Sequence, residues 1–278
     1  MRLATLGPEQ RPHAIVVRKD GGVQVDGYAD VGELLRGGVR ALKAARAAQD
    51  SSEALAFDAH ELLRPVLRPG AVVCVGLNYR SHILEMGREL PEFPTLFCKL
   101  PRALTDPYAE VTLPAASEQV DYEGELAVVI GTGGRDIDRA RAWEHVAGLT
   151  VLNDVTARDY QQRTLQWFAG KTFQRCTPMG PWVVTPDEFG ELGERELVVS
   201  VNGEKRQDAV LGDLVFDVPA LVAELSRIVE LEPGDVIATG TPGGVGEPAG
   251  KFLRPGDEVV VRIDGVGELR NTFRSSTR

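Results

Sequence analysis

The sequence contains few cysteines and few histidines. Its three cysteines, Cys74, Cys98 and Cys176, are an odd number at wide spacing and form no CxxC pair, which argues against a disulfide framework and against a cysteine-based zinc site. The first ten residues contain no apolar segment of the kind that a secretory signal requires. We therefore expect a cytoplasmic protein in a reducing environment.

Long apolar runs and an excess of positive charge are also missing. The longest uninterrupted apolar runs, residues 71–75 and 126–130, are far shorter than the roughly 20 residues of a membrane helix. Lysine and arginine number 31 against 41 aspartate and glutamate, which gives a formal net charge of -10. Because nucleic acids and anionic membranes attract positively charged surfaces, we expect neither a nucleic-acid partner nor a membrane partner.

The composition nevertheless supports a well-packed protein. The 278 residues, 43% of them hydrophobic, are sufficient for a sizeable core in one large domain or two smaller ones. Residues 13–17 and 23–25 predict a hairpin around an Asp-Gly-Gly turn, because Asp-Gly supplies the positive φ of a tight turn. Apolar residues between positions 31 and 45 follow helical spacing with a Gly-Gly break. We predict a small α+β N-terminal domain over residues 1–69.

Strand patterns dominate from residue 70 onward. Segments rich in β-branched and apolar residues predict strands at 125–130, 149–153, 182–185, 197–201, 236–239 and 258–263. Helices are predicted at 137–147 and, with Asp217 as its cap, at 218–229. No alternation of strand and helix favours a Rossmann sheet. We predict a β-rich α+β fold in which residues 70–278 form the main domain.

An acidic segment, DYEGE at 121–125, leads directly into an apolar strand pattern. Alternate residues of an extended chain share a face, so Asp121, Glu123 and Glu125 would crowd on one side. Asp154 follows a second apolar segment and brings a further carboxylate within reach. Two glutamates and one aspartate form an all-oxygen set that suits Mg²⁺ or Mn²⁺. The alternative is a solvated strand end whose acidic residues discourage edge pairing.

A histidine and a glutamate form the second candidate group. His82 and Glu85 are three residues apart, so on a helical turn they would share a face. A carboxylate that fixes the tautomer of an imidazole makes the histidine a general base for water. A purely structural histidine is equally compatible with this spacing, because most single histidines have no catalytic role.

Other motifs are less specific. The glycine-rich residues 239–246 lack both a Walker lysine and a GxGxxG pattern, so a turn is favoured over a phosphate-binding loop. The hydroxyl of Thr241 in this segment could donate to a carboxylate. Lys171 and Lys99 lie near aromatic residues, although most lysines are solvated. No GxSxG motif occurs, which disfavours a serine acyl-enzyme.

The motifs taken in chain order are GLNY at 76–79 with His82 and Glu85, DYEGEL at 121–126, NDVTARD at 153–159, GK at 170–171, and GDVIATGTP at 234–242. Together they closely resemble the fumarylacetoacetate hydrolase family over about residues 70–278. The resemblance implies a mixed β-sandwich or roll, a homodimer, and Mg²⁺ or Mn²⁺ in the middle of the fold.

The resemblance also implies roles for individual residues. The implied metal ligands are Glu123, Glu125 and Asp154, whereas Asp121 is not carried over as a ligand. The implied water-activating pair is His82 and Glu85. The implied substrate contacts are Lys171, Arg158, Gln161 and Thr241.

The activity that this resemblance implies is hydrolysis of a carbon–carbon bond in a β-diketo acid of the acylpyruvate or fumarylpyruvate type, in aromatic or sugar-acid catabolism. A metal would chelate the keto-acid substrate, His82 and Glu85 would activate water, and Lys171 would stabilise enolate charge. Two alternatives use the same site, an oxaloacetate-type decarboxylase and a 2-hydroxydienoate isomerase. A non-catalytic metal-stabilised binding protein is disfavoured, because both members of the His–Glu pair are present.

Overall fold

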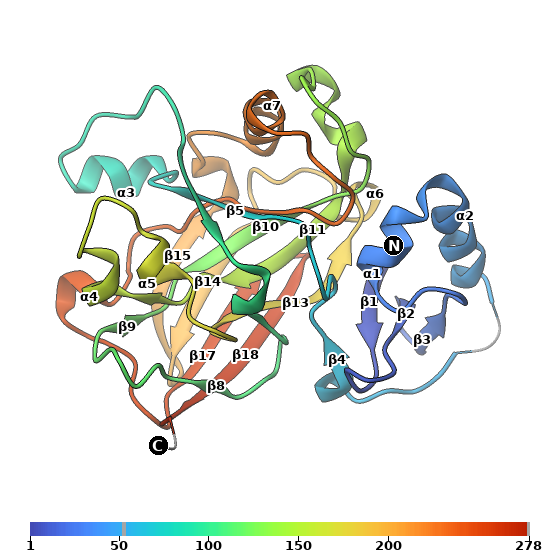
Figure 1. Ribbon diagram of the computed structural model, residues 1–278, viewed down its shortest axis with the longest axis horizontal. Coiled ribbons are helices and arrows are strands. Elements are labelled where there is room, and N and C mark those ends of the chain that lie inside the picture. Colours follow the sequence, from blue (N-terminus) through green and yellow to red (C-terminus); the bar gives the residue numbers. More distant parts are fainter. Residues whose placement is uncertain (52–53, 277–278) are drawn as a thin grey trace.

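The computed structural model describes residues 1–51 and 54–276 of the chain (Figure 1). Two β-sheets pack on each other and helices cover the outside, which confirms the predicted β-rich α+β class. Among the described residues, no helix combines the length and the apolar character needed to cross a bilayer.

The large sheet has eleven strands within the described residues, and nine of them form one path. Their order is β3 (Gly21–Gln24), β2 (His13–Arg18), β1 (Arg2–Leu6), β13 (Thr177–Val184), β11 (Val146–Asn153), β10 (Gly124–Ile130), β16 (Val236–Ala238), β5 (Val72–Gly76) and β6 (Thr95–Lys99). Off this path, β4 (Leu62–Leu63) pairs with β1 and β7 (Leu104–Thr105) pairs with β13.

The second sheet of the described chain is antiparallel except at one edge. Its order is β15 (Glu204–Val210), β14 (Glu196–Val201), β17 (Glu258–Ile263), β18 (Gly267–Arg274) and β8 (Val111–Thr112). A separate short ribbon pairs β12 (Thr156–Ala157) with β9 (Val120–Asp121).

The helices lie around these sheets. The α-helices are α1 (Val31–Arg36), α2 (Gly38–Gln49), α3 (Arg80–Glu85), α4 (Arg158–Gln161), α5 (Phe168–Lys171), α6 (Pro186–Phe189) and α7 (Val218–Ile228). The 3₁₀ turns are η1 (Ala59–Glu61), η2 (Pro101–Ala103), η3 (Arg139–His145), η4 (Leu211–Asp213) and η5 (Glu247–Ala249).

The N-terminal elements follow the sequence prediction. The predicted hairpin is β2 and β3, and α1 and α2 are separated at Gly37 as expected, with Asp30 capping α1 through the N–H of Glu33. Strand β1 pairs with β13, so the large sheet continues from these residues into the rest of the chain. The domain boundary at residue 69 stays a prediction.

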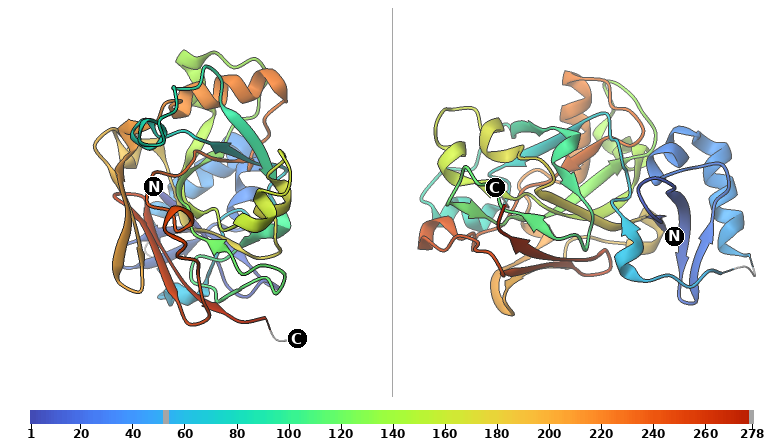
Figure 2. Two further views of the ribbon diagram at one scale, coloured as in Figure 1. Left: turned by 90° about the vertical axis from the view of Figure 1, so that its left-hand side faces the viewer. Right: turned by 60° about the horizontal axis from the view of Figure 1, so that its bottom comes forward.

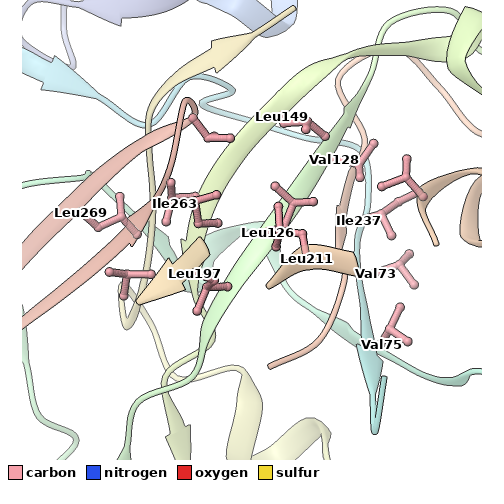
Figure 3. Close-up of a cluster of buried hydrophobic side chains, with 14 of the residues drawn as sticks. Val73, Val75, Leu126, Val128, Leu149, Leu197, Leu211, Ile237, Ile263 and Leu269 are labelled. Carbon is pink, nitrogen blue, oxygen red and sulfur yellow. The ribbon is translucent and has the colours of Figure 1, made fainter. Parts of the chain in front are cut away.

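Strand β10 explains how polar groups reach the interior. All seven of its residues are buried, and its side chains alternate between two apolar clusters. Leu126 and Val128 join the cluster between the two sheets, together with residues such as Leu197 and Ile263 (Figure 3), whereas Ala127 joins the cluster toward α1 and α2. A strand buried on both faces places whatever precedes it in the centre of the molecule.

One predicted helix is wrong. Residues 137–147 form a shorter 3₁₀ segment, η3, and Val146 already belongs to β11, where it pairs with Ile130. The apolar residues Ile137, Ala140 and Trp143 are spaced by three, which suits the three residues per turn of a 3₁₀ helix as well as it suits an α-helix. The predicted helix at 218–229 is confirmed as α7, and its cap Asp217 accepts the N–H of Ala220.

Candidate active site

Three carboxylates meet at the ends of the two central strands. The pairing of β10 with β11 places Gly124 opposite Asn153. Asp154, the next residue after Asn153, therefore lies beside Glu123, and its N–H donates to the Glu123 carbonyl at 2.8 Å. Glu125 lies one residue beyond Gly124 along β10. Each of the three side chains is buried, and their ligand oxygens all lie within 4.8 Å of one another. The structure therefore brings together the three residues that the sequence predicts as metal ligands.

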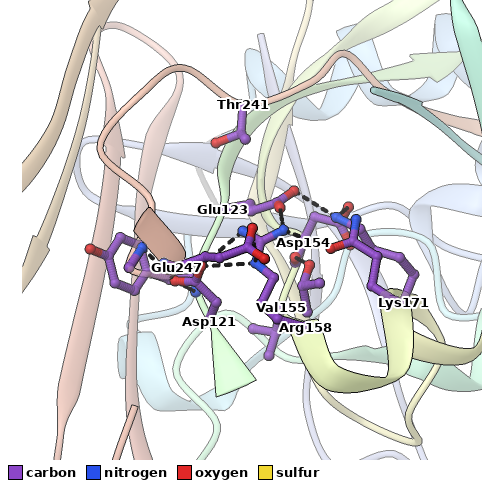
Figure 4. A network of polar contacts seen from close by, with 12 residues as sticks. Asp121, Glu123, Asp154, Val155, Arg158, Lys171, Thr241 and Glu247 are labelled. Atoms are coloured by element: carbon purple, nitrogen blue, oxygen red, sulfur yellow. Dashed lines mark hydrogen bonds and ion pairs between the residues drawn. The ribbon is translucent and has the colours of Figure 1, made fainter. Parts of the chain in front are cut away.

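Two lysines and an arginine hold Glu123 and Asp154 (Figure 4). Lys171 donates to Glu123 Oε2 at 2.6 Å and to Asp154 Oδ2 at 2.7 Å. Lys99 pairs with the other oxygen of Asp154 and donates to the Val155 carbonyl at 3.1 Å. Arg158 lies 2.6 Å from Glu123 Oε1. Each oxygen of Asp154 is thus paired with a lysine.

Asp121 is separate from the triad. The chain is not one extended strand over 121–125, because β9 ends at Asp121 and β10 begins at Gly124, so the predicted crowding of three carboxylates on one strand face is wrong. Asp121 instead accepts the Arg158 Nε–H at 2.9 Å and the backbone N–H groups of Gly246 and Glu247 at 2.8 and 3.0 Å. Asp121 therefore holds the guanidinium of Arg158 in place and is itself fixed by the two backbone N–H groups.

The donor set fits a divalent cation. Four buried acids, Asp121, Glu123, Glu125 and Asp154, face three buried bases, Lys99, Arg158 and Lys171, which leaves an excess of one negative charge. Glu125 accepts only the Gly240 N–H, at 2.8 Å, and has no lysine or arginine partner among the described residues.

Burial, reinforced by Asp154 and Glu123, raises the pKa of Glu125 well above its usual value. A cation between the three carboxylates would stabilise the charged form of Glu125. Three carboxylates without sulfur or imidazole suit Mg²⁺ or Mn²⁺ rather than Zn²⁺.

Amide side chains fix the backbone of the triad. Asn153 Oδ1 accepts the Glu123 N–H at 3.0 Å, and Gln207 Oε1 accepts the Gly124 N–H at 2.9 Å. The Gln207 amide also donates to Thr241 Oγ1 at 2.9 Å, and Thr241 donates to the Gly124 carbonyl at 3.0 Å. Gln207 carries no motif signal in the sequence, because its role depends on a contact between β15 and the glycine-rich segment far along the chain.

A cavity of about 740 Å³ opens beside Glu123, the member of the triad that is among its lining residues. Figures 1 and 2 show that α3, α4 and α5 lie at the end of the molecule away from β2, β3 and α2. The predicted site residues that line the cavity are His82, Glu123, Arg158, Gln161, Lys171 and Thr241. The structure thus places the predicted substrate contacts around one space beside the carboxylates.

His82 and Glu85 lie on α3, as the spacing predicts. A Cβ at Gly243 would be 3.1 Å from His82 Nδ1 and 3.3 Å from Glu85 Oε2, so both side chains face the glycine-rich segment. Within the described chain they form no hydrogen bond with each other. Burial lowers the pKa of His82, and the negative charges of Glu85 and Glu123, which raise it, offset only part of this effect. The imidazole is therefore neutral near pH 7.

The sequence predicts no role in the site for Lys99. Its side chain is fully buried at the end of β6 and contacts Asp154, so it belongs to the charged centre although it does not line the cavity. The sequence offers only one weak signal for it, its place directly after an apolar strand pattern. Its contact with Asp154 depends on how β5 and β6 pair beside the central strands.

Comparisons with known proteins agree with this site. The family described as fumarylacetoacetate (FAA) hydrolase C-terminal matches residues 71–274. The oxaloacetate tautomerase YisK of Bacillus subtilis (strain 168) is 43% identical over 222 residues, which are 76% of this chain and 72% of that protein. The mitochondrial oxaloacetate tautomerase FAHD2A of Homo sapiens is 45% identical over 213 residues, 75% of this chain and 68% of that protein.

Solved structures match over the whole chain. A putative HpcE protein from Mycobacterium smegmatis has a TM-score of 0.89 and 38% identity, and the match covers 100% of both chains. Maleylpyruvate hydrolase from Sphingobium sp. SYK-6, in complex with manganese(II) and pyruvate, has a TM-score of 0.83 and 29% identity, again over 100% of both chains. The chain therefore belongs to the fumarylacetoacetate hydrolase family of enzymes.

Proposed function

We propose that this protein is an oxaloacetate tautomerase, which interconverts the enol and keto forms of oxaloacetate. The observation that carries the proposal is the similarity to YisK and human FAHD2A, both named oxaloacetate tautomerases, at 43% and 45% identity. This activity belongs to the same metal-enolate chemistry as the sequence-based alternatives of decarboxylation and isomerisation, and it is favoured over acylpyruvate hydrolysis.

Glu123, Glu125 and Asp154 are the residues that would hold Mg²⁺ or Mn²⁺, because they supply three buried oxygens and an excess of negative charge. A bound divalent cation would supply a Lewis acid for the carboxylate and 2-oxo oxygens of the substrate. Arg158 pairs with the Glu123 carboxylate, and the side-chain amides of Asn153 and Gln207 accept the backbone N–H groups of Glu123 and Gly124, which fixes the chain that carries the ligands.

His82 is the proton acceptor in this proposal. Conversion of the keto form to the enol removes one proton from C3 and adds one to the C2 oxygen, and the reverse reaction exchanges the same two protons. A neutral imidazole that lines the cavity can take the C3 proton. The charge of Glu85 raises the basicity of His82.

Lys171 is the fixed positive charge of the cavity wall beside the triad. Burial lowers its pKa, but Asp154 and Glu123 outweigh burial and raise the pKa above the usual lysine value, so the ammonium stays charged at any working pH. A permanent cation at this position stabilises negative charge on the C2 oxygen of the substrate. Lys171→Met should therefore lower kcat more than it raises KM.

Acylpyruvate hydrolysis is a second candidate, because the structural match to maleylpyruvate hydrolase in complex with manganese(II) and pyruvate covers the whole chain. Hydrolysis needs an activated water at a distal carbonyl, whereas tautomerisation needs only proton transfer. His82 and Glu85 suit either reaction, and the substrates that the protein accepts distinguish the two.

A substrate panel tests the proposal. With Mg²⁺ present, the purified protein should accelerate the loss of enol absorbance of oxaloacetate more than it releases pyruvate from oxaloacetate or cleaves acylpyruvates. Lys205→Met, which changes an exposed lysine paired with Asp208, is the control and should keep full activity. Efficient cleavage of an acylpyruvate together with no tautomerisation would replace the proposal with the hydrolase.

A further inference from the structure

The active-site cavity is lined by four basic side chains, His82, Arg88, Arg158 and Lys171. Arg158 and Lys171 are each paired with two buried carboxylates. Arg88 is different, because among the residues that the structure describes no carboxylate, carbonyl or hydroxyl group pairs with its guanidinium. A permanent positive charge in the cavity is therefore not neutralised by the described protein.

Arg88 follows the helix that carries His82. Gly87 has a φ of 67°, in the left-handed region that commonly follows a helix end, and the Arg88 N–H donates to the Ile83 carbonyl at 3.2 Å. This turn brings residue 88 back beside α3. His82 and Arg88 both line the cavity, and the charge of Arg88 adds to burial in lowering the pKa of His82.

Glu123 and Arg88 reach the cavity from different elements. Glu123 directly precedes β10, whereas Arg88 comes from the segment after α3. Glu247 also lines the cavity, but its carboxylate accepts a hydrogen bond from the Gln162 amide and lies 3.7 Å from Arg158 Nε, so within the described chain it pairs with these two groups and not with Arg88. A substrate held at the triad by one end would meet Arg88 with a different part of its structure.

Oxaloacetate carries two carboxylates. The carboxylate next to the 2-oxo group belongs at the triad under the proposed function. The distal carboxylate then lies further out in the cavity, where the exposed Arg88 is a cation without a partner among the described residues. A guanidinium binds a carboxylate through two parallel N–H donors. We propose that Arg88 binds the distal carboxylate and thereby selects 2-oxo dicarboxylates over 2-oxo acids with a neutral distal end.

This inference rests on the proposed function and adds a specificity residue to it. The other side chains that line the outer cavity, such as Gln161, Thr164, Gln166 and Trp167, are neutral. These side chains can donate a hydrogen bond to a carboxylate or pack against the carbon chain of a substrate. None of them supplies the positive charge that would favour a dicarboxylate over a neutral analogue.

The test compares Arg88→Met with wild type on oxaloacetate and on its 4-methyl ester, which lacks the distal charge. A charge-assisted hydrogen bond contributes about 1.5–3 kcal/mol, and less where solvent screens it as at the exposed Arg88, so Arg88→Met should raise KM for oxaloacetate by up to about 10-fold, with kcat changed little. The KM for the ester should be the same in both proteins. Arg88→Lys should restore part of the preference.

Arg80→Met is the matched control, because Arg80 is an exposed arginine at the start of α3, the helix that Arg88 follows, and does not line the cavity. It should behave as wild type on both substrates. An unchanged KM for oxaloacetate in Arg88→Met, or an equal loss on acid and ester, would overturn the inference while the tautomerase proposal survives.

If wild type tautomerises neither compound, the proposed function fails. Calorimetric binding of oxaloacetate and the ester to the Mg²⁺-loaded proteins still decides the role of Arg88. Weaker binding of the acid alone to Arg88→Met supports the role, and equal binding to both proteins rejects it.

Discussion

The N-terminal region and the active-site end differ in how many hydrogen-bond donors they provide to a buried carboxylate. Asp30 in the N-terminal region is buried and accepts two backbone N–H groups, those of Glu33 and Leu67, at 2.6 and 2.7 Å. Glu125 at the active-site end is equally buried and accepts only one. The fold satisfies the carboxylate that caps a helix, whereas Glu125 accepts a single N–H, and that difference fits a cation at the triad.

Ion pairs show the same contrast. The pair of Arg18 with Asp20 lies at the surface of the N-terminal region, with side chains 25% and 57% exposed. The pair of Lys99 with Asp154 is fully buried. Surface pairs contribute little to stability, whereas a buried charge that loses its partner destabilises a protein strongly. The first region is held by its apolar cluster, and the second depends on charge balance.

The largest expected effect is that of removing a ligand. Glu125→Gln should lower the affinity for Mg²⁺ and reduce kcat/KM at least about 1000-fold, because a metal contributes several kcal/mol to the stabilisation of transition-state charge. Titration calorimetry and the tautomerase assay measure the two losses. Glu144→Gln, at an exposed glutamate paired with Arg141, should change neither.

The same variant sharpens the contrast with Asp30. The raised pKa of Glu125 means that the folded protein without metal binds a proton that the unfolded chain releases, so its stability falls as the pH rises above the ordinary carboxyl range. In chelator, Glu125→Gln should flatten this decline. An unaltered pH dependence would contradict the electrostatic account of the triad.

Loss of the proposed base is the next effect in size. His82→Ala should lower kcat on the order of 10²-fold to 10⁴-fold, the usual contribution of a general base, with Mg²⁺ affinity preserved because His82 is not a ligand. The measurement is the tautomerase rate at saturating Mg²⁺. A variant that retains most of its kcat would show that another group moves the C3 proton.

The two ion pairs can be compared by breaking each of them. Lys99→Met should lower the free energy of unfolding in chelator by about 3–5 kcal/mol, because it leaves a buried carboxylate short of a partner. Asp20→Asn, which breaks the surface pair and keeps the bonds of Arg18 to the Gln49 and Ser51 carbonyls, should leave that free energy nearly unchanged. Urea unfolding measures both, and equal losses would remove the distinction between the regions.

The smallest expected effect is a shift of a pH profile. His82 acts as a base when neutral, so the rate should fall as the pH drops through the pKa of His82. Glu85 raises that pKa, and Glu85→Gln should therefore move the acidic limb of the kcat profile to lower pH. A shift to higher pH would mean that Glu85 does not act on His82 through its charge.

The sequence was most informative where neighbouring residues carry the signal. Glu123 and Glu125 precede a continuous apolar strand, and His82 and Glu85 share a helical turn, so local spacing predicted both groups. The roles of Lys99, Gln207 and Arg88 depend on strand pairing and on a turn between distant segments, and no local pattern encodes them. The helix predicted at 137–147 failed because a spacing of three suits two helix types. The cytoplasmic location and the homodimer stay predictions.

The central claim is that the triad holds one divalent cation. Crystals soaked in Mn²⁺ and measured at the manganese absorption edge locate the ion directly. The account predicts a single strong anomalous peak between Glu123, Glu125 and Asp154, with Lys171 no longer bridging two of these carboxylates and Lys99 still in contact with Asp154. A triad without an anomalous peak, or with Mn²⁺ bound elsewhere while Lys171 keeps both of its pairs, would contradict it.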